Sequence, residues 1–327
     1  MTLRRTPDRI AEMIRAAGKI ALTCHVHPDG DTLGSALALA LAAGKMGKTV
    51  HVFCDDPVPQ VLRMMQGSGA VMTPDQADDA YDLLIAVDTA DEKRMGACFG
   101  LIGRAAATAQ VDHHGTNPAY MQENDVDPAA SATALLVYEL IGALGAALDR
   151  DIATCLYVAV ATDTGNLSFS NTTPEAFRVM GELLGYGVPL SELNRVLFRQ
   201  RTAAQIGVLS CALDSLKYLG NGSITMMTLT QAEQQRFGAR GEDAEGIVNF
   251  GVDIEGVGMT AFLREMENGA VKVSMRAVEP HTVDQIARQF GGGGHTQAAG
   301  CTMYCTMDEA VTQLEQAMLQ AMGKEQA

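Results

Sequence analysis

Short apolar runs alternate with segments of helical periodicity over the first 185 residues of the chain. Four runs are typical of buried strands because they are short, apolar and bounded by glycine or polar residues. They occupy residues 19–24, 49–54, 81–88 and 105–112. Helical patterns fill the intervals and continue to about residue 185, and Thr6-Pro7 is the expected start of the first helix. Strands alternating with helices predict a largely parallel α/β sheet.

The pattern of apolar and polar residues changes in the second part of the chain, where it indicates β-hairpins. Residues 216–228 would turn at Gly-Asn-Gly, and residues 258–277 at Glu-Asn-Gly. We therefore predict an α/β fold with two domains: an N-terminal parallel-sheet domain with flanking helices, and a smaller mixed α+β domain across a cleft. The predicted boundaries are 1–185 for the first domain, 186–204 for a linker and 205–327 for the second domain.

Composition and charge narrow the function classes. The chain has 327 residues, of which 47% are hydrophobic, and it has no tryptophan, so its cores should consist of Ala, Leu, Val and Met. A net charge of −15 argues against a protein that coats long nucleic acids, although a bound metal pair could still attract a small phosphorylated substrate. Seven cysteines without a Cys-x-x-Cys pair favour reduced thiols and a cytoplasmic location. The apolar runs are too short for a membrane span.

Acidic and imidazole side chains recur where the predicted strands end. Each group alone has an ordinary explanation as a turn or a helix cap. Together they are hard to assign to chance, because the carboxyl ends of parallel strands form the ligand crevice of open α/β sheets. Asp163 differs in that it ends a helical run. The candidate residues are His25, Asp29, Asp31, Asp88, Asp112, His113, His114 and Asp163.

Mixed carboxylate and imidazole ligands suit Mn²⁺ or a similar divalent ion. A shared carboxylate can hold two such ions about 3.5–4 Å apart, an arrangement that clamps the attacking and leaving oxygens in phosphoryl displacement. The sequence "HVHPDGD" would then be half of a cradle for two metal ions.

The order of these groups resembles the four signature motifs of the DHH phosphoesterase superfamily. In addition, "GGGGHTQAAG" (residues 291–300) resembles the glycine-rich motif of the DHH-associated C-terminal domain. The resemblance covers nearly the whole chain. Length and domain content are most similar to the bacterial branch of oligoribonucleases and pAp (3′-phosphoadenosine 5′-phosphate) phosphatases, the nanoRNases.

This resemblance implies two Mn²⁺ ions, with Mg²⁺ and Co²⁺ as alternatives. His25 and Asp29 would hold one ion, with Asp88 as the bridge. The other ion would be held by Asp31, His113 and Asp163. His114 would face the scissile phosphate. Asp112 would fix the orientation of an imidazole without being a metal ligand itself. His27, where many relatives are expected to carry asparagine, is interpreted as a neighbour of the site.

The second domain offers candidate phosphate contacts. Glycine lets backbone N–H groups approach a phosphate, and a guanidinium can bind one with two hydrogen bonds. Arg276 lies on a predicted strand, and Arg94 is a weaker candidate in the first domain. The predicted substrate contacts are Arg94, Arg276, Gly292, Gly293, Gly294 and His295. Thr133 is interpreted as part of a helix N-cap.

The predicted function is metal-dependent hydrolysis of oligoribonucleotides of about two to five residues, and of pAp to AMP. The expected partners are short single-stranded RNA or DNA and pAp, with no membrane, and a homodimer is compatible with the sequence. Two alternatives stay open: a phosphodiesterase for cyclic or linear dinucleotides, and a non-catalytic nucleotide-binding module. A family II pyrophosphatase is disfavoured because its Ser-Arg-Lys-Lys cluster is missing.

Overall fold

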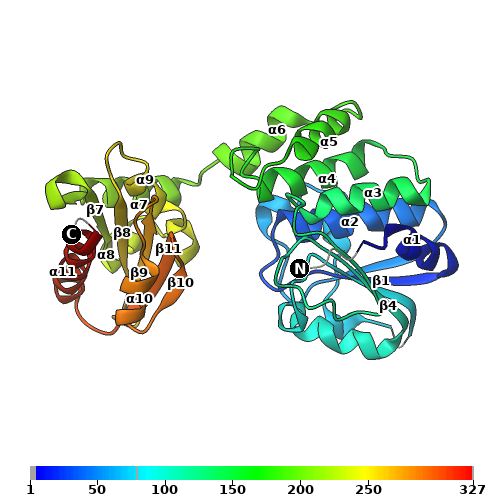
Figure 1. Ribbon diagram of the computed structural model, residues 1–327, viewed down its shortest axis with the longest axis horizontal. Coiled ribbons are helices and arrows are strands. Elements are labelled where there is room, and N and C mark those ends of the chain that lie inside the picture. Colours follow the sequence, from blue (N-terminus) through cyan, green and yellow to red (C-terminus); the bar gives the residue numbers. More distant parts are fainter. Residues whose placement is uncertain (1–4, 79, 326–327) are drawn as a thin grey trace. The chain divides into compact units, whose positions relative to one another are not determined.

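The computed structural model describes residues 5–78 and 80–325, which fall into two compact units (Figure 1). Unit 1 spans Met1–Gln200 and unit 2 spans Arg201–Ala327. The segment 186–204, expected as a linker, contains helix α6 (Leu190–Asn194) and the π-helical turn η5 (Arg195–Arg199).

Unit 1 is built on a five-stranded sheet of order β2-β1-β3-β4-β5, in which every neighbouring pair is parallel. The α/β class predicted from the alternation of strands and helices is confirmed. Each run predicted to be a strand is one, and the structure adds a fifth strand. The strands are β1 (Lys19–Thr23), β2 (Thr49–Phe53), β3 (Tyr81–Val87), β4 (Ala105–Asp112) and β5 (Glu123–Val126).

Helices cover both faces of this sheet. One face packs in a large apolar core with helices α1 to α5, and the other packs against the 3₁₀ segment η4 (Glu92–Arg104) (Figure 1). The helices are α1 (Pro7–Ala16), α2 (Gly30–Lys45), α3 (Thr133–Leu144), α4 (Arg150–Asp163) and α5 (Pro174–Leu184).

Two glycines one turn apart let α2 approach α4 closely. A Cβ atom at Gly34 would lie 2.5 Å from the carbonyl oxygen of Cys155, and one at Gly30 would lie 2.2 Å from Thr162 Oγ1. Any side chain at these positions would push the helices apart. The same approach brings the first turn of α2, which carries Asp31, to the last turn of α4, which carries Asp163.

The prediction that helical patterns fill every interval is wrong between β2 and β4. The structure has only 3₁₀ segments there: η1 (Gln60–Leu62), η2 (Ser68–Ala70), η3 (Pro74–Gln76) and η4. Prolines and glycines in "PVPQ" and "GSG" prevent a long helix from forming. Strand β5 was missed because its sequence, "ENDV", is short and mostly polar.

Unit 2 contains a mixed six-stranded sheet of order β10-β11-β9-β8-β7-β6. Both predicted hairpins are present, as the antiparallel pairs β6–β7 and β8–β9, whereas β7 and β8 are parallel. The strands are β6 (Lys217–Leu219), β7 (Ile224–Leu229), β8 (Met259–Glu265), β9 (Val271–Ala277), β10 (Gly293–His295) and β11 (Ala298–Met303). The helices are α7 (Ala203–Asp214), α8 (Gln231–Arg236), α9 (Ile247–Val252), α10 (Asp284–Gln289) and α11 (Met307–Glu325).

Helices cover the two faces of this second sheet unequally. The apolar core on one face includes α10 and α11 and reaches across β7, β8, β9 and β11. The core on the other face, under α7 and α9, takes strand residues from β7 and β8. Polar side chains of β9 and β11 occupy the remainder of that second face. In the part of the chain that the structure describes, no helix is long and apolar enough to cross a membrane.

Candidate metal centre and phosphate pocket

The acidic and imidazole residues singled out from the sequence gather at one edge of the unit 1 sheet. His25 follows β1, Asp88 follows β3, and His113 follows β4. In the order 2-1-3-4-5 the chain reverses direction across the sheet between β1 and β3, and the crevice at the carboxyl ends there is the usual ligand position. Helix α4 delivers Asp163 to the same place.

The first potential ligand group consists of His25, Asp29 and Asp88, whose donor atoms lie within 4.8 Å of one another. His25 Nε2 is 3.5 Å from Asp29 Oδ2 and 3.5 Å from Asp88 Oδ2. His25 Nδ1 is 2.8 Å from the carbonyl oxygen of Val26. Since a carbonyl only accepts, this contact assigns a proton to Nδ1 and leaves Nε2 as the ring atom that faces the two carboxylates.

The second group consists of Asp31, His113 and Asp163, again within 4.8 Å. His113 Nε2 is 3.5 Å from Asp163 Oδ2 and 4.0 Å from Asp31 Oδ2. His113 Nδ1 lies 3.1 Å from the carbonyl oxygen of Ala130, so this ring is held in the same way as His25.

Asp88 lies between the two groups. Its Oδ2 faces His25, and its Oδ1 is 3.7 Å from His113 Nε2. The residue is 2% exposed and has a φ of +57°, a conformation that costs free energy for any side chain but is best tolerated by Asp and Asn. The hydroxyl of Thr133 donates to Asp88 Oδ1 at 2.7 Å and fixes the carboxylate in this position.

Asp31 is held by the start of α3. Its Oδ2 accepts from the backbone N–H of Thr133 at 2.6 Å, and its Oδ1 accepts from the N–H of Ala134 at 3.0 Å and from the hydroxyl of Ser35 at 3.1 Å. A helix N-terminus favours a carboxylate, and these hydrogen bonds oppose, without cancelling, the effect of burial on Asp31, which is only 1% exposed.

His114 lies against His113, forms a third potential ligand group with Asp88 and His113, and is oriented by Asp112. Its Nδ1 donates to Asp112 Oδ1 at 2.8 Å, while Asp112 Oδ2 accepts from the side-chain amide of Asn117. The contact with Asp112, a fully buried residue, raises the pKa of His114 against the effect of burial. Because Nδ1 is engaged, Nε2 is the atom of His114 left for a substrate.

The charges of the cluster call for cations. Burial, followed by repulsion from Asp88 and Asp163, raises the pKa of Asp31 well above its ordinary value. Burial also raises the pKa of Asp163, to about 6, although His113 opposes the shift. Burial lowers the pKa of His25, but contacts with Asp29 and Asp88 outweigh it and raise that pKa to about 9. Carboxylates gathered around imidazole nitrogens fit divalent metal ions, which would take the place of the proton that the raised pKa assigns to His25 Nε2.

The two remaining candidates in unit 1 lie beside the cluster. The carbonyl oxygen of Arg94 accepts from the N–H of Val26 at 2.8 Å, so η4 supports the loop that carries His25. Among the described residues, the Arg94 side chain has no hydrogen bond or ion pair. The side chain of His27 is 88% exposed, pairs with Asp56 and belongs to neither ligand group, in agreement with its interpretation as a neighbour.

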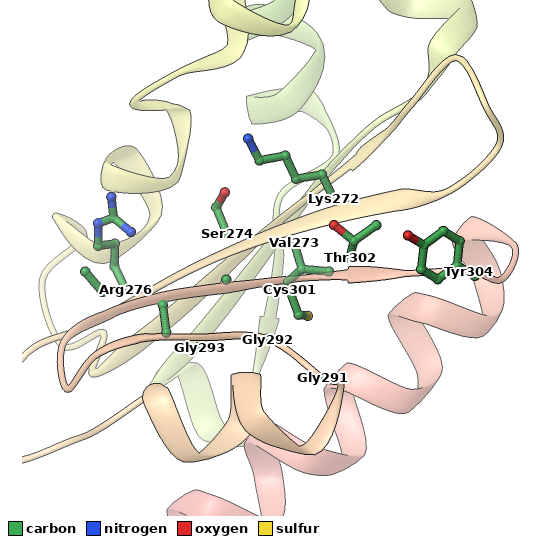
Figure 2. A pocket seen from close by; sticks show the side chains of 13 residues that line it. Lys272, Val273, Ser274, Arg276, Gly291, Gly292, Gly293, Cys301, Thr302 and Tyr304 are labelled. Carbon is green, nitrogen blue, oxygen red and sulfur yellow. The ribbon is translucent and has the colours of Figure 1, made fainter. Parts of the chain in front are cut away.

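In unit 2 a pocket of about 610 Å³ lies against β9, β11 and the glycine run (Figure 2). Three of the predicted substrate contacts, Arg276, Gly292 and Gly293, line it, whereas Gly294 and His295 are exposed residues of β10 outside its lining. The lining residues are Lys272, Val273, Ser274, Arg276, Gly291, Gly292, Gly293, Ala298, Ala299, Gly300, Cys301, Thr302 and Tyr304.

The glycine run lies between helix α10 and strand β11. Gly291, at φ +73°, follows the end of α10, and the N–H of Gly292 donates to the carbonyl oxygen of Ala287 at 2.9 Å as part of this helix cap. Gly293 and Gly294 then pair with β11, where a Cβ atom at Gly294 would lie 2.4 Å from the carbonyl oxygen of Ala298. The N–H of Gly292 is therefore already used, which corrects its predicted role as a phosphate donor.

Two residues near the cluster were not assigned to it from the sequence. Thr133 contacts both Asp31 and Asp88, and Asn117 holds Asp112 within a buried amide network with Gln110. The prediction that Thr133 caps a helix is wrong: Ala132 is the N-cap of α3 and Thr133 is its first residue, so its hydroxyl is available to Asp88.

Matches to known families agree with this geometry. Residues 19–160 match the DHH family, N-terminal domain, and residues 221–324 match the DHHA1 domain. The fold and the site therefore define a phosphoesterase of the metal-dependent class. The chain belongs to the DHH family, as its resemblance to the signature motifs predicted.

Relatives align over nearly the full chain. The bifunctional oligoribonuclease and PAP phosphatase NrnA of Thermus thermophilus is 36% identical over 90% of this chain and 87% of its own length. The Bacillus subtilis protein of the same name is 27% identical over 89% and 91% of the two chains. An exopolyphosphatase-related protein from Bacteroides fragilis has a similar structure, with a TM-score of 0.86 at 28% identity and coverage of 96% and 95%.

Proposed function

We propose that this phosphoesterase hydrolyses short oligoribonucleotides to mononucleotides and removes the 3′-phosphate of pAp. The observation that carries the proposal is the pair of ligand groups that face each other across Asp88. The names of the relatives from Thermus thermophilus and Bacillus subtilis support the substrate class.

In the proposed site, His25, Asp29 and Asp88 hold one Mn²⁺, and Asp31, His113, Asp163 and Asp88 hold the other. Two divalent ions bound there would neutralise phosphate charge and lower the pKa of the attacking water. Mixed carboxylate and imidazole donors favour Mn²⁺, although Mg²⁺ and Co²⁺ are compatible with the same set.

The chain's own residues supply orientation and a proton. The attacking water gives up one proton to solvent as its oxygen forms a bond to phosphorus, the bond from phosphorus to the ester oxygen breaks, and that oxygen takes up a proton. His114 Nε2 is the donor in our proposal, because Asp112 fixes the ring through Nδ1 and leaves Nε2 free. Thr133 keeps Asp88 in position through its hydroxyl.

Unit 2 would bind a phosphate that is not hydrolysed. Arg276 lines the pocket, and its only hydrogen bond among the described residues is to the carbonyl oxygen of Met275, its own neighbour. A guanidinium without a carboxylate partner is suited to a phosphate. We include Gly293 and His295 as further contacts at the edge of β10, and Arg94 in unit 1.

We further propose that the enzyme works in the cytoplasm, where thiols stay reduced. All seven cysteines are free, and five of them are buried. A homodimer stays a prediction.

The test compares substrates of different length. Protein stripped with a chelator and supplied with Mn²⁺ should release phosphate from pAp and degrade a dinucleotide faster than a 20-residue RNA. Equal or faster turnover of the long RNA would contradict the proposal. Binding of pAp without phosphate release under any divalent ion would favour a non-catalytic nucleotide-binding module instead.

A further inference from the structure

The phosphate pocket of unit 2 extends beyond the residues that one phosphate requires. On β9, Lys272, Ser274 and Arg276 alternate with buried residues and therefore point to the same face of the sheet (Figure 2). A second cavity, of about 340 Å³, borders the same three residues on the side of β8. The polar side chains of β9 thus form a ridge between two adjoining depressions.

The end of the ridge near Lys272 carries its own set of groups. Thr302 on β11 and Arg264 on β8 are the register partners of Lys272, so a hydroxyl and a second cation flank its ammonium group. Tyr304 lies two residues after Thr302 and points to the same face. It lines the first pocket, and 86% of its surface is exposed. An exposed aromatic ring beside cations is the usual arrangement for binding single-stranded nucleic acid.

The charges at this end are not neutralised within the chain. Among the described residues, Lys272 has no ion pair or hydrogen bond, and Arg264 donates only to the amide oxygen of Gln234, at 3.1 Å. One carboxylate, Glu245, lines the second cavity. In a protein of net charge −15, a face with three cations and one carboxylate selects anions.

Lys272 and Arg276 stand at opposite ends of the ridge. They are four residues apart on one strand, which separates their Cα atoms by roughly 13 Å, with Ser274 between them. On the opposite strand Gly300 faces Ser274, and its missing side chain leaves the floor of the pocket open between the two cations. With the side chains placed as in Figure 2, the two cations face separate parts of the pocket, so a ligand with two phosphates can contact both at once.

We propose that Lys272, Thr302 and Tyr304 form a distal subsite that binds an additional phosphate and base of an oligonucleotide and that pAp does not use. This inference rests on the proposed function. Besides the phosphate that reacts, pAp carries only one other, which the proposed function assigns to Arg276, so none is left for Lys272. An oligonucleotide has further phosphates and a further base to offer. The subsite therefore favours the longer members of the short-substrate class over pAp.

The test compares pAp with a pentaribonucleotide. In Lys272→Met, which removes the charge and keeps an apolar stem, KM for the pentamer should rise roughly tenfold while KM for pAp stays within about twofold. Tyr304→Leu should raise KM for the pentamer by a similar factor, and Tyr304→Phe, which keeps the stacking ring, should not. Lys217→Met, at an exposed lysine of β6 in the same sheet, is the matched control and should change neither KM.

Direct binding separates this inference from the proposed function. In the Asp88→Asn background, which prevents turnover, fluorescence anisotropy of a labelled pentamer should show a roughly tenfold weaker Kd in Lys272→Met. The slope of log Kd against log salt should fall by about 0.7, the value for one phosphate contact on a single strand. A wild-type protein that hydrolyses neither pAp nor the pentamer would contradict the proposed function but not the distal subsite. An unchanged pentamer Kd in Lys272→Met, or equal losses for pentamer and pAp, would overturn the distal subsite.

Discussion

The metal centre of unit 1 and the phosphate pocket of unit 2 are built in opposite ways. In the first, the ligand side chains are backed by further hydrogen bonds, as Asp31 is by Thr133, Ala134 and Ser35. In the second, the side chain of Lys272 projects from β9 into the pocket without any partner among the described residues. The first arrangement fixes atoms for chemistry, and the second leaves charge available for recognition. We therefore expect changes in unit 1 to act on kcat and changes in unit 2 to act on KM.

The largest effect is expected at Asp88. Asp88→Asn should lower kcat on the order of 10³-fold or more, because an amide oxygen is a poor replacement for a carboxylate between two cations. Asparagine is preferable to alanine here because it tolerates the positive φ of this position. The thermal midpoint of the metal-free protein should change by only a few degrees. Turnover close to that of the wild type would remove Asp88 from the centre of the site.

A smaller loss of kcat is expected from Asp112→Asn. Both carboxylate oxygens of Asp112 accept hydrogen bonds, from His114 and from Asn117, whereas an asparagine has only one acceptor and must give up one of them. We expect kcat to fall about 10- to 100-fold with KM and metal content unchanged. Asp125→Asn is the control. Asp125 lies on β5 and is as buried as Asp112, but it forms an ion pair with Arg5. If both variants lose kcat equally, the role of Asp112 is structural.

The smallest effect, and one on a different kinetic constant, is expected in unit 2. Arg276→Gln should raise KM for pAp about tenfold and leave kcat within about twofold, because the guanidinium holds a phosphate that does not react. Arg240→Gln, at an exposed arginine of the same unit, should leave both constants unchanged. If Arg276→Gln lowers only kcat, the expectation that changes in unit 2 act on KM is wrong.

The sequence predicts the positions of the metal-centre residues better than the contacts that hold them. Asp88 and His113 follow apolar strands, and the carboxyl ends of parallel strands meet at one edge, so their convergence followed from the pattern. The contact of Thr133 with Asp88 depends on where α3 begins relative to β3, two elements 45 residues apart in the chain. No local pattern contains that information.

Glycine patterns were ambiguous for a related reason. The run Gly291 to Gly294 has the composition of a flexible loop, yet the structure divides it between a helix cap and the edge strand β10. Pairing with β11 depends on Gly294, where the two backbones approach closely: a Cβ atom there would lie 2.4 Å from the carbonyl oxygen of Ala298. Only tertiary packing reveals that requirement.

The central claim is that two divalent ions bind in unit 1 and share Asp88. Elemental analysis of the protein after dialysis against Mn²⁺ and then against metal-free buffer tests this claim most directly. Our account predicts two Mn²⁺ per chain in the wild type, at least one fewer in Asp88→Asn, and an unchanged count in Arg276→Gln. A fully active wild-type protein with no bound metal, or an Asp88→Asn protein that still binds two ions, would contradict it.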